Sequence, residues 1–236
     1  MTQTTTSRRL DRTEARRQMY RALILEGAER EFARVGFSDA KVQDIASASD
    51  VSLATLYKTF AGKDDIYDAV HLMRMRELIA YATDSLSEIE SHFDRLLVAI
   101  ARQTEYFTTH PNYLRMHIRD GQSWATASEI GKINPKSAAA TWRAGIAMMN
   151  DGVKAAIDAE EIVPLRPELV TGIIISALQV WLTDWFESGE DRPTAEVGNE
   201  LTRHLRRSFG NLPSDGDLTL SSEPMNGQPS RREQNS

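Results

Sequence analysis

The spacing of the apolar residues is the feature that most constrains the fold of this chain. Between Arg16 and Phe209, apolar side chains recur at three- and four-residue steps, and no sustained apolar–polar alternation is found. Steps of three and four are typical of amphipathic helices, whereas alternation is typical of half-buried strands. The sequence therefore predicts an all-α protein of about nine helices.

Breaks in this pattern indicate the domain boundaries. Gly36 follows the first long apolar stripe, as a glycine often does at a helix end. Pro111 and Pro135 interrupt later stripes, because the residue before a proline avoids the helical region. The last residues are rich in Ser, Pro, Gly, Asn and Gln, a composition that cannot bury enough apolar surface to order the chain. We predict a flexible basic arm (1–14), a three-helix domain (15–62), a second helical domain (63–210) and a disordered tail (211–236).

Composition excludes several classes of protein. The chain has no cysteine, which excludes disulfides, thiolate metal sites and cysteine nucleophiles. No apolar run follows the N-terminus at the distance of a signal peptide. The longest apolar stretch, Leu169 to Leu182, is interrupted by polar residues and is shorter than a bilayer span requires. We therefore expect a cytoplasmic protein without membrane contact.

Charge is distributed unevenly along the chain, whose net charge is −6. Residues 1–63 carry 11 Lys/Arg and 8 Asp/Glu, whereas the remainder carries 17 and 26. A basic head on an acidic body would hold DNA at one end only. The arginines of the arm have two interpretations, a solvated tail or additional contacts to phosphates and the minor groove.

The segment from Gly36 to Ile66 is the most informative part of the sequence. Val42, Ile45 and Ala46 predict a short helix with one apolar face, and Ser49-Asp50 is a turn signal. Ser52 is a favourable N-cap for a second short helix that runs to Phe60. We expect Ala46, Val51, Leu56 and Phe60 to lock the two helices together above Phe32 and Phe37. Two short helices joined by a tight turn form a helix-turn-helix.

These residues resemble a known family. The run I-A-S-A-S-D-V-S-L-A-T-L-Y-K-T-F-A-G-K-D-D-I, from Ile45 to Ile66, is similar to the DNA-binding signature of the tetracycline-repressor (TetR) family. The preceding F-A-R-V-G-F, from Phe32 to Phe37, is similar to the end of that family's first helix. The resemblance covers Arg16 to Ile66. It implies an N-terminal three-helix DNA-binding domain followed by a helical ligand-binding and dimerisation domain.

Several side chains of this unit are candidates for contact with double-stranded DNA. The hydroxyl of Tyr57 and the ammonium of Lys58 are donors that reach phosphates or base edges. Lys63 opens the next helix, where the helix dipole already favours an anion. Together with the positions that the resemblance implies, the DNA-binding candidates are Lys41, Gln43, Ser52, Leu53, Ala54, Thr55, Tyr57, Lys58 and Lys63.

Two residues depart from the family pattern. Lys41 stands where a capping Thr is usual, so we expect Asp39 to cap the first helix of the motif instead. Asp50 stands where the turn usually has Gly. Because Asp tolerates the left-handed conformation better than most residues, we expect the turn to be kept.

The helix predicted over Leu169 to Glu187 is apolar on nearly all sides, so it must be buried on more than one face. The resemblance implies that the last two long helices form a homodimer interface, although an ordinary monomer core explains the pattern as well. The expected interface residues are Ile174, Leu178, Trp181, Trp185, Leu201 and Leu205.

Adaptable methionines and aromatic side chains suit the walls of a ligand pocket, although plain core packing explains any one of them. The ligand-binding candidates are Phe107, Met116, His117, Trp124, Trp142, Met149 and Gln179. The five histidines lack the spacing of a metal site. We therefore expect neither a metal nor a cofactor.

The resemblance implies a ligand-responsive transcriptional regulator that binds a near-palindromic operator as a homodimer. By default of the family it is a repressor that an unidentified small-molecule effector releases from DNA. One alternative is a DNA-binding dimer without a small-molecule ligand. A second is an enzyme, but the sequence lacks a nucleophile elbow, and we expect no enzymatic activity.

Overall fold

The computed structural model describes residues 3–119 and 136–211, and the side chains of residues 14–119 and 140–211. Within these ranges the chain is helical, and its one β-type contact is an isolated bridge between Ile162 and Gly210. The all-α prediction is therefore confirmed. We call the first three helices the head; they are α1 (Gln3–Asp39), α2 (Val42–Ala48) and α3 (Leu53–Thr59). The other helices form the body; they are α4 (Lys63–Thr83), the 3-10 helix η1 (Leu86–Glu88), α5 (His92–Thr109), α6 (Pro111–Arg119), α8 (Lys136–Asp158), α9 (Pro167–Glu187) and α10 (Thr194–Phe209).

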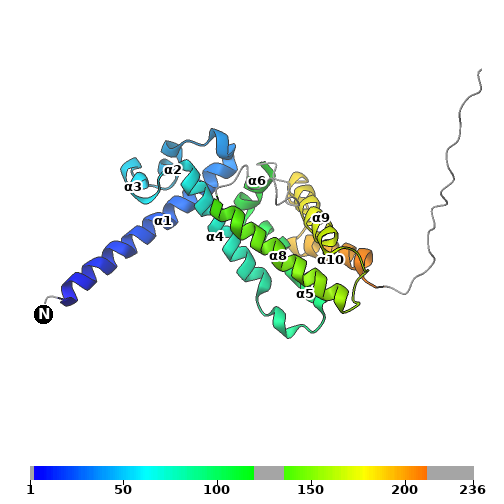
Figure 1. Cartoon of the computed structure of the whole chain (residues 1–236). Coiled ribbons are helices and arrows are strands. Elements are labelled where there is room, and N and C mark those ends of the chain that lie inside the picture. The colour runs from blue at the N-terminus through cyan, green and yellow to red at the C-terminus, as the bar shows by residue number, and fades with distance from the viewer. Residues whose placement is uncertain (1–2, 120–135, 212–236) are drawn as a thin grey trace, which may run out of the picture.

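The first helix begins earlier than the sequence suggests. α1 includes residues 3–14, which were expected to form a flexible arm, and Figure 1 shows this end projecting away from the rest of the molecule. An ion pair of 3.0 Å between Glu14 and Arg17 has the i, i+3 spacing that supports a helix. The helix is broken at Gly36, whose φ of 83° confirms the predicted end, and one further turn reaches Asp39. The predicted disordered tail lies outside the described residues from position 212 onward.

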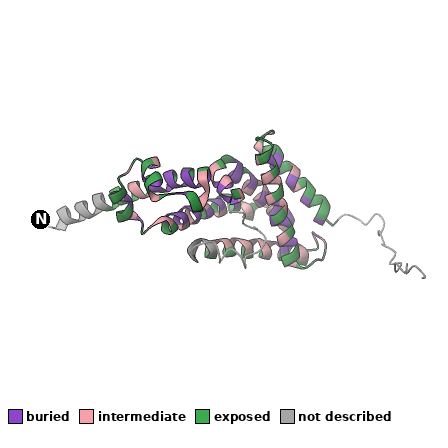
Figure 2. Ribbon diagram, turned by 90° about the horizontal axis from the view of Figure 1, so that it is seen from above, coloured by how far each residue is buried: buried purple, intermediate pink, exposed green. Residues whose placement is uncertain are grey.

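The core of the head is made by residues close together in the sequence. α2 and α3 both pack on α1 (Figure 1), and Ile45, Leu56 and Phe60 are buried against Phe32 and its neighbours. The Phe32 ring lies 5.1 Å from the ring of Tyr67 on α4 in an edge-on contact. The predicted interlocking of the two short helices is confirmed, and Figure 2 shows buried residues continuing from the head into the body.

The body is organised around α5. This helix contacts α4, α6, α8, α9 and α10, and α8 lies across α4, α5 and α9. The head rests on the body through α1, which packs against both α4 and α6. α2 and α3 therefore lie at the opposite end of the molecule from α9 and α10 (Figure 1).

Helix α9 is long and apolar enough to cross a membrane by length and composition alone. This corrects the sequence estimate, which counted only Leu169 to Leu182. A core helix of a soluble protein passes the same test, and one face of α9 does enter the core of the body, through residues such as Ile174 and Leu182. Its other face carries the exposed apolar residues Leu169, Ile173 and Val180.

Candidate nucleic-acid interface and effector cavity

Helix α3 is held by a side-chain cap. Ser52 has an extended backbone, and its Oγ accepts a hydrogen bond from the Thr55 N–H at 3.1 Å. The Ser52 and Thr55 hydroxyls are also hydrogen-bonded at 2.9 Å. The predicted N-cap is therefore confirmed, and it fixes where α3 starts.

The turn before α3 also keeps its expected form. Asp50 has a φ of 52°, in the left-handed region that the usual Gly would adopt, so the prediction that the turn is kept is confirmed. A close approach that the sequence analysis missed supports this turn: a Cβ at Gly27 of α1 would lie 2.2 Å from Ser49 Oγ. Any larger residue at Gly27 would push the turn away from α1.

Helix α2 begins without a side-chain cap. Its N-cap residue is Lys41, and no side chain there accepts a hydrogen bond from the first turn. The prediction that Asp39 caps this helix is wrong. The first turn instead relies on the Lys41 carbonyl, which accepts from the N–H groups of Asp44 at 3.0 Å and Ile45 at 3.1 Å.

The outward side of α3 is open. Leu53, Ala54, Tyr57 and Lys58 are exposed, and the Tyr57 side chain is 52% exposed, whereas Leu56 on the same helix is fully buried. Lys41, Gln43 and Ser52 are also exposed, and Thr55 is half-buried beside its cap. Eight of the nine DNA-binding candidates thus lie on or beside α2 and α3, with their side chains at least partly accessible.

Lys63 differs from the other candidates. Its Nζ donates to the carbonyl oxygens of Phe37 at 2.7 Å and Ser38 at 3.0 Å, and it lies 4.6 Å from the centre of the Phe37 ring. The first residue of α4 therefore ties this helix to the end of α1. Lys63 connects the head to the body in addition to the phosphate contact predicted for it.

A cavity of about 250 Å³ lies in the body between α4, α5, α8 and α9. Three predicted ligand-binding residues line it, namely Phe107, Trp142 and Met149. Met116 and His117 are buried but are not among the lining residues, and Gln179 is not among them either. Trp124 lies outside the described residues.

Sequence reasoning missed most of the cavity wall. α4 contributes Leu78, Ile79 and Ala82, and α5 contributes a polar strip that contains Arg95 and Gln103. Arg95 and Gln103 are eight residues apart, which places them on one side of a helix. That spacing was visible in the sequence, whereas the pairing of α5 with α4 and α8 was not.

Two buried histidines meet where the head joins the body. The rings of His71 on α4 and His117 on α6 lie 5.5 Å apart, and His71 also packs edge-on against Tyr67 at 4.4 Å. Burial lowers the pKa of His71 to about 4, against a smaller opposing effect of the nearby Asp68. Burial likewise holds the pKa of His117 well below its usual value, and the neighbouring His71 lowers it further. Both rings are therefore neutral at pH 7.

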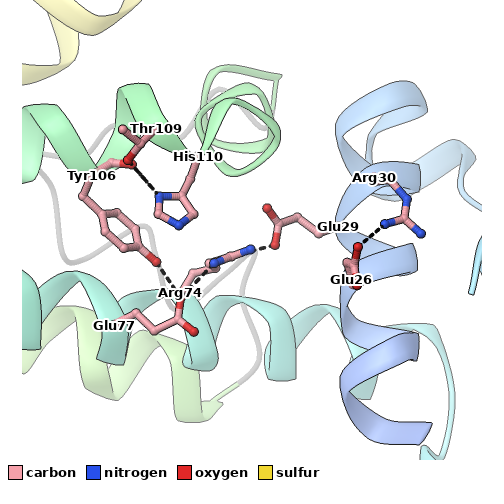
Figure 3. Close-up of polar contacts among 8 residues, drawn as sticks. All are labelled: Glu26, Glu29, Arg30, Arg74, Glu77, Tyr106, Thr109 and His110. Atoms are coloured by element: carbon pink, nitrogen blue, oxygen red, sulfur yellow. Dashed lines mark hydrogen bonds and ion pairs between the residues drawn. The ribbon is translucent and has the colours of Figure 1, made fainter. Parts of the chain in front are cut away.

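A polar network links the same two parts of the molecule (Figure 3). Arg74 of α4 pairs with the buried Glu29 of α1 at 2.7 Å and with Glu77 at 2.8 Å, and the Tyr106 hydroxyl donates to Glu77 at 2.8 Å. Burial by itself would lower the pKa of Arg74, but the hydrogen bond and charge of Glu29 raise it overall. The guanidinium is therefore charged and clamps α1 to α4.

The structure does not leave the predicted dimer residues available for a partner. Ile174, Leu178, Trp185, Leu201 and Leu205 are buried within a single chain, and only Trp181 is half-exposed, with its ring 5.1 Å from His204. Within the single chain, the bulky stripe of α9 packs into the core of the body. The outward stripe of α9 is instead formed by Leu169, Ile173 and Val180, which are 44%, 40% and 60% exposed.

Known proteins resemble this chain in its head and in its overall fold. Residues 24–70 match the family model described as bacterial regulatory proteins, tetR family. The chain is 29% identical over 107 residues to the HTH-type transcriptional repressor SCO4008 of Streptomyces coelicolor, an alignment that covers 45% of this chain. It spans about half of that relative's length, 52%.

Two solved structures share the fold. The fatty acid degradation regulator FadR from Bacillus halodurans superimposes with a TM-score of 0.67 at 13% identity, covering 79% of this chain and 94% of its own. FadR from Bacillus subtilis, solved in complex with stearoyl-CoA, superimposes with a TM-score of 0.64 at 18% identity, covering 78% and 96%. At these identities the likeness concerns the fold. Over residues 24–70, with the capped α3 and the left-handed turn, this chain matches the tetR family of bacterial regulatory proteins, and its overall fold is that of these two solved regulators.

Proposed function

We propose that this protein is a ligand-responsive, DNA-binding transcriptional regulator, and that it acts as a repressor which a small molecule releases from its operator. The observation that carries the proposal is α3, a short capped helix that buries Leu56 and exposes Tyr57 and Lys58. A helix presented in this way enters the major groove, where its first residues meet base edges and the flanking donors meet phosphates.

The exposed side chains have different roles in this proposal. Ala54 is small, so the N-terminal end of α3 approaches base edges closely at this position, and Leu53 beside it offers an apolar contact. Tyr57 and Lys58 donate to phosphates or to guanine, and Lys41 and Gln43 reach the DNA from the start of α2. Because most of these contacts are to phosphates, affinity falls as salt is raised.

A second copy of the chain would cover the outward face of α9. Leu169, Ile173 and Val180 follow each other at helical steps and are exposed in the single chain, which is unusual for three large apolar side chains on one helix. Two-fold pairing through this face would present two α3 helices to two half-sites, about one helical turn apart. α9 and the head lie at opposite ends of the molecule (Figure 1), which leaves α3 free for DNA.

The cavity is the proposed effector site, because one of its walls is α4. Met75, Leu78 and Ile79 of that helix face the cavity, while Lys63 and Arg74 of the same helix hold α1. An effector that moves α4 therefore moves the head. By linkage, the effector weakens DNA binding by the same factor by which DNA weakens effector binding. The rival without a ligand would be favoured by a close-packed body, which the cavity argues against.

DNA binding is tested by fluorescence anisotropy on DNA from upstream of the protein's own gene, over a series of salt concentrations. We expect tight binding that saturates at two chains per site. Tyr57→Phe removes one hydrogen bond to a charged phosphate and weakens binding by about tenfold. Tyr81→Phe, an exposed tyrosine of α4 in the body, is the matched control and leaves binding unchanged. Equal binding to operator and random DNA would contradict the proposal.

Dimerisation is tested by sedimentation velocity. We expect the wild type to sediment as a dimer and Val180→Glu to sediment as a monomer, because a charge would be buried unpaired in the interface. Met19→Glu changes an exposed apolar residue of α1, far from α9, and leaves the dimer intact. A dimer that survives Val180→Glu would place the interface elsewhere.

A further inference from the structure

The charges that line the cavity are unbalanced. Among the described lining residues there is one permanent cation, Arg95, and no carboxylate. The other polar residues there are His92, Gln103 and Thr83, and the remaining lining residues are apolar or glycine. The cavity therefore has a single positively charged edge in an otherwise apolar wall.

Two carboxylates at the start of α5 are engaged with other groups. Glu161 caps the start of α5, where it accepts from the Phe93 N–H at 2.6 Å, the Ser91 hydroxyl at 2.9 Å and the His92 N–H at 3.2 Å. Asp94 pairs with Arg206 at 2.6 Å. In the part of the chain that the structure describes, Arg95 itself donates to the Ile89 carbonyl and lies 3.5 Å from His92 Nδ1, and it forms no ion pair.

The polar and apolar lining residues of α5 are separated around the helix. Arg95, Ala99 and Gln103 follow one another at four-residue steps, and Leu96, Ile100 and Phe107 form the adjacent apolar stripe. The facing walls from α4, α8 and α9 are almost wholly apolar, with Met75, Met149 and Ile175 among them. A molecule that fits the cavity would have an apolar portion against these walls and one polar group at Arg95.

The charge of Arg95 decides between kinds of occupant. A neutral apolar molecule would cover the guanidinium without replacing its water, which is unfavourable because the ion is then left without a charged partner. A cationic molecule would also be repelled. A carboxylate can accept two parallel hydrogen bonds from a guanidinium, which offsets the desolvation of both groups.

We propose that the effector is a compact amphiphile with an apolar chain and an anionic carboxylate group, and that Arg95 and Gln103 bind the carboxylate. The cavity volume of about 250 Å³ lies just below the usual range of ligand pockets, about 300–1,000 Å³. That size favours a single short apolar chain over a large polycyclic or nucleotide-bearing molecule. This inference rests on the proposed function of the cavity as the effector site.

Titration calorimetry with three probes of equal chain length tests the inference. Octanoate, octanol and octylamine share the same chain length and differ in their polar group, which is anionic, neutral or cationic. We expect the full-length protein to bind octanoate at least tenfold tighter than octanol, and to bind octylamine weakest of the three.

Variants test whether Arg95 causes the preference for the anionic probe. Arg95→Met keeps most of the apolar stem and removes the charge, so the preference for octanoate over octanol is lost while octanol binding is kept. Arg102→Met is the matched control, because this arginine is on the same helix, does not line the cavity and donates to the Asp84 carbonyl. It retains the full preference. Ala99→Phe fills the cavity and abolishes binding of all three probes.

The outcomes that overturn the inference are distinct from those that overturn the effector site. If octanol binds as tightly as octanoate, or if Arg95→Met keeps the preference, the proposal that the effector carries a carboxylate is wrong, while the cavity remains a binding site. If none of the probes binds, or if Ala99→Phe leaves binding unchanged, the effector site itself is wrong. DNA binding measured by anisotropy is independent of both results.

Discussion

The head and the body are both built from helices, but they close their cores in different ways. The core of the head joins residues 24–60, which are close in sequence, and Phe32, Ile45 and Leu56 are fully buried there. The body brings together helices from α4 to α9 and leaves a cavity between them. A DNA-reading surface needs a fixed shape, whereas an effector site needs walls that can adjust. The close packing of the head and the cavity in the body match these two requirements.

The exposed faces of the two regions also differ, since that of α3 is polar and that of α9 is apolar. α3 exposes Tyr57 and Lys58, which suit a polar and charged partner such as DNA. α9 exposes Ile173 and Val180, which suit another protein surface. The difference between the faces separates the two proposed partners, although both faces belong to the same chain.

The largest expected effect comes from the core of the head. Phe32→Ala removes a fully buried ring that packs against Phe37 and Tyr67, and we expect a loss of about 4 kcal/mol in the free energy of unfolding. Met149→Ala, at the wall of the existing cavity, should lose only about 1 kcal/mol, because fewer packed neighbours are left without contact. Urea unfolding followed by circular dichroism measures both. Equal losses would mean that the cavity is filled by close packing in solution.

The link between the two regions should give the next largest effect. Arg74→Met leaves the buried Glu29 carboxylate without its partner, and we expect a loss of about 3 kcal/mol in stability. Because this pair clamps α1 to α4, we also expect the single unfolding transition to broaden or to separate into two.

Arg76→Met is the control for this prediction. Arg76 is on the same helix but exposed, so the variant should stay within about 0.5 kcal/mol of the wild type. If Arg74→Met is as stable as Arg76→Met, the network of Figure 3 does not couple the head to the body.

The head could be predicted from the sequence because its contacts are local. The N-cap at Ser52, the left-handed Asp50 and the helix break at Gly36 each depend on residues within a few positions of one another. The Asp39 cap was wrong because the chain reaches α2 in an extended conformation at Lys41, a detail that residue preference alone does not determine.

The body could be predicted only in outline, since its contacts join distant segments. The helical character of the body followed from periodicity, but the side of α9 that meets the core did not. A helix that is apolar all round gives no indication of which stripe is buried in its own chain, so Ile174 and Leu178 were assigned to a partner. Likewise, Arg95 lines the cavity only because α4 and α8 close over α5.

Acid should weaken the junction between head and body. The pKa of His71 is lowered by burial to about 4, so the unfolded chain, in which His titrates near 6.5, binds more protons between these values. Stability is therefore full above pH 6.5 and falls as the pH is lowered towards 4. For His71 alone we expect a loss of about 2 kcal/mol between pH 7 and pH 5.

Urea unfolding at pH 7, 6 and 5 measures this loss. Because burial lowers the pKa of His71 to about 4, the stability slope in this window reports the protonation of this buried ring. His71→Phe should flatten the slope, whereas His204→Phe, an exposed histidine of α10, should leave it unchanged. A wild-type protein equally stable at pH 7 and pH 5 would contradict the neutral, buried state of His71.

The smallest effect compares the two helices of the DNA-reading unit with each other. α3 has a side-chain cap and α2 has none, so Ser52→Ala should lose about 1 kcal/mol, while Lys41→Ser should gain a similar or smaller amount by supplying a hydroxyl to the first turn of α2. Chemical denaturation measures both changes. Operator affinity should separate them further, since Lys41→Ser also removes a cation proposed to meet phosphate, and its salt dependence should fall by about one unit of slope. A Lys41→Ser variant that binds DNA with an unchanged salt slope would show that Lys41 does not contact a phosphate, even if the variant is more stable. The phosphate contacts would then be confined to α3 and the residues flanking it.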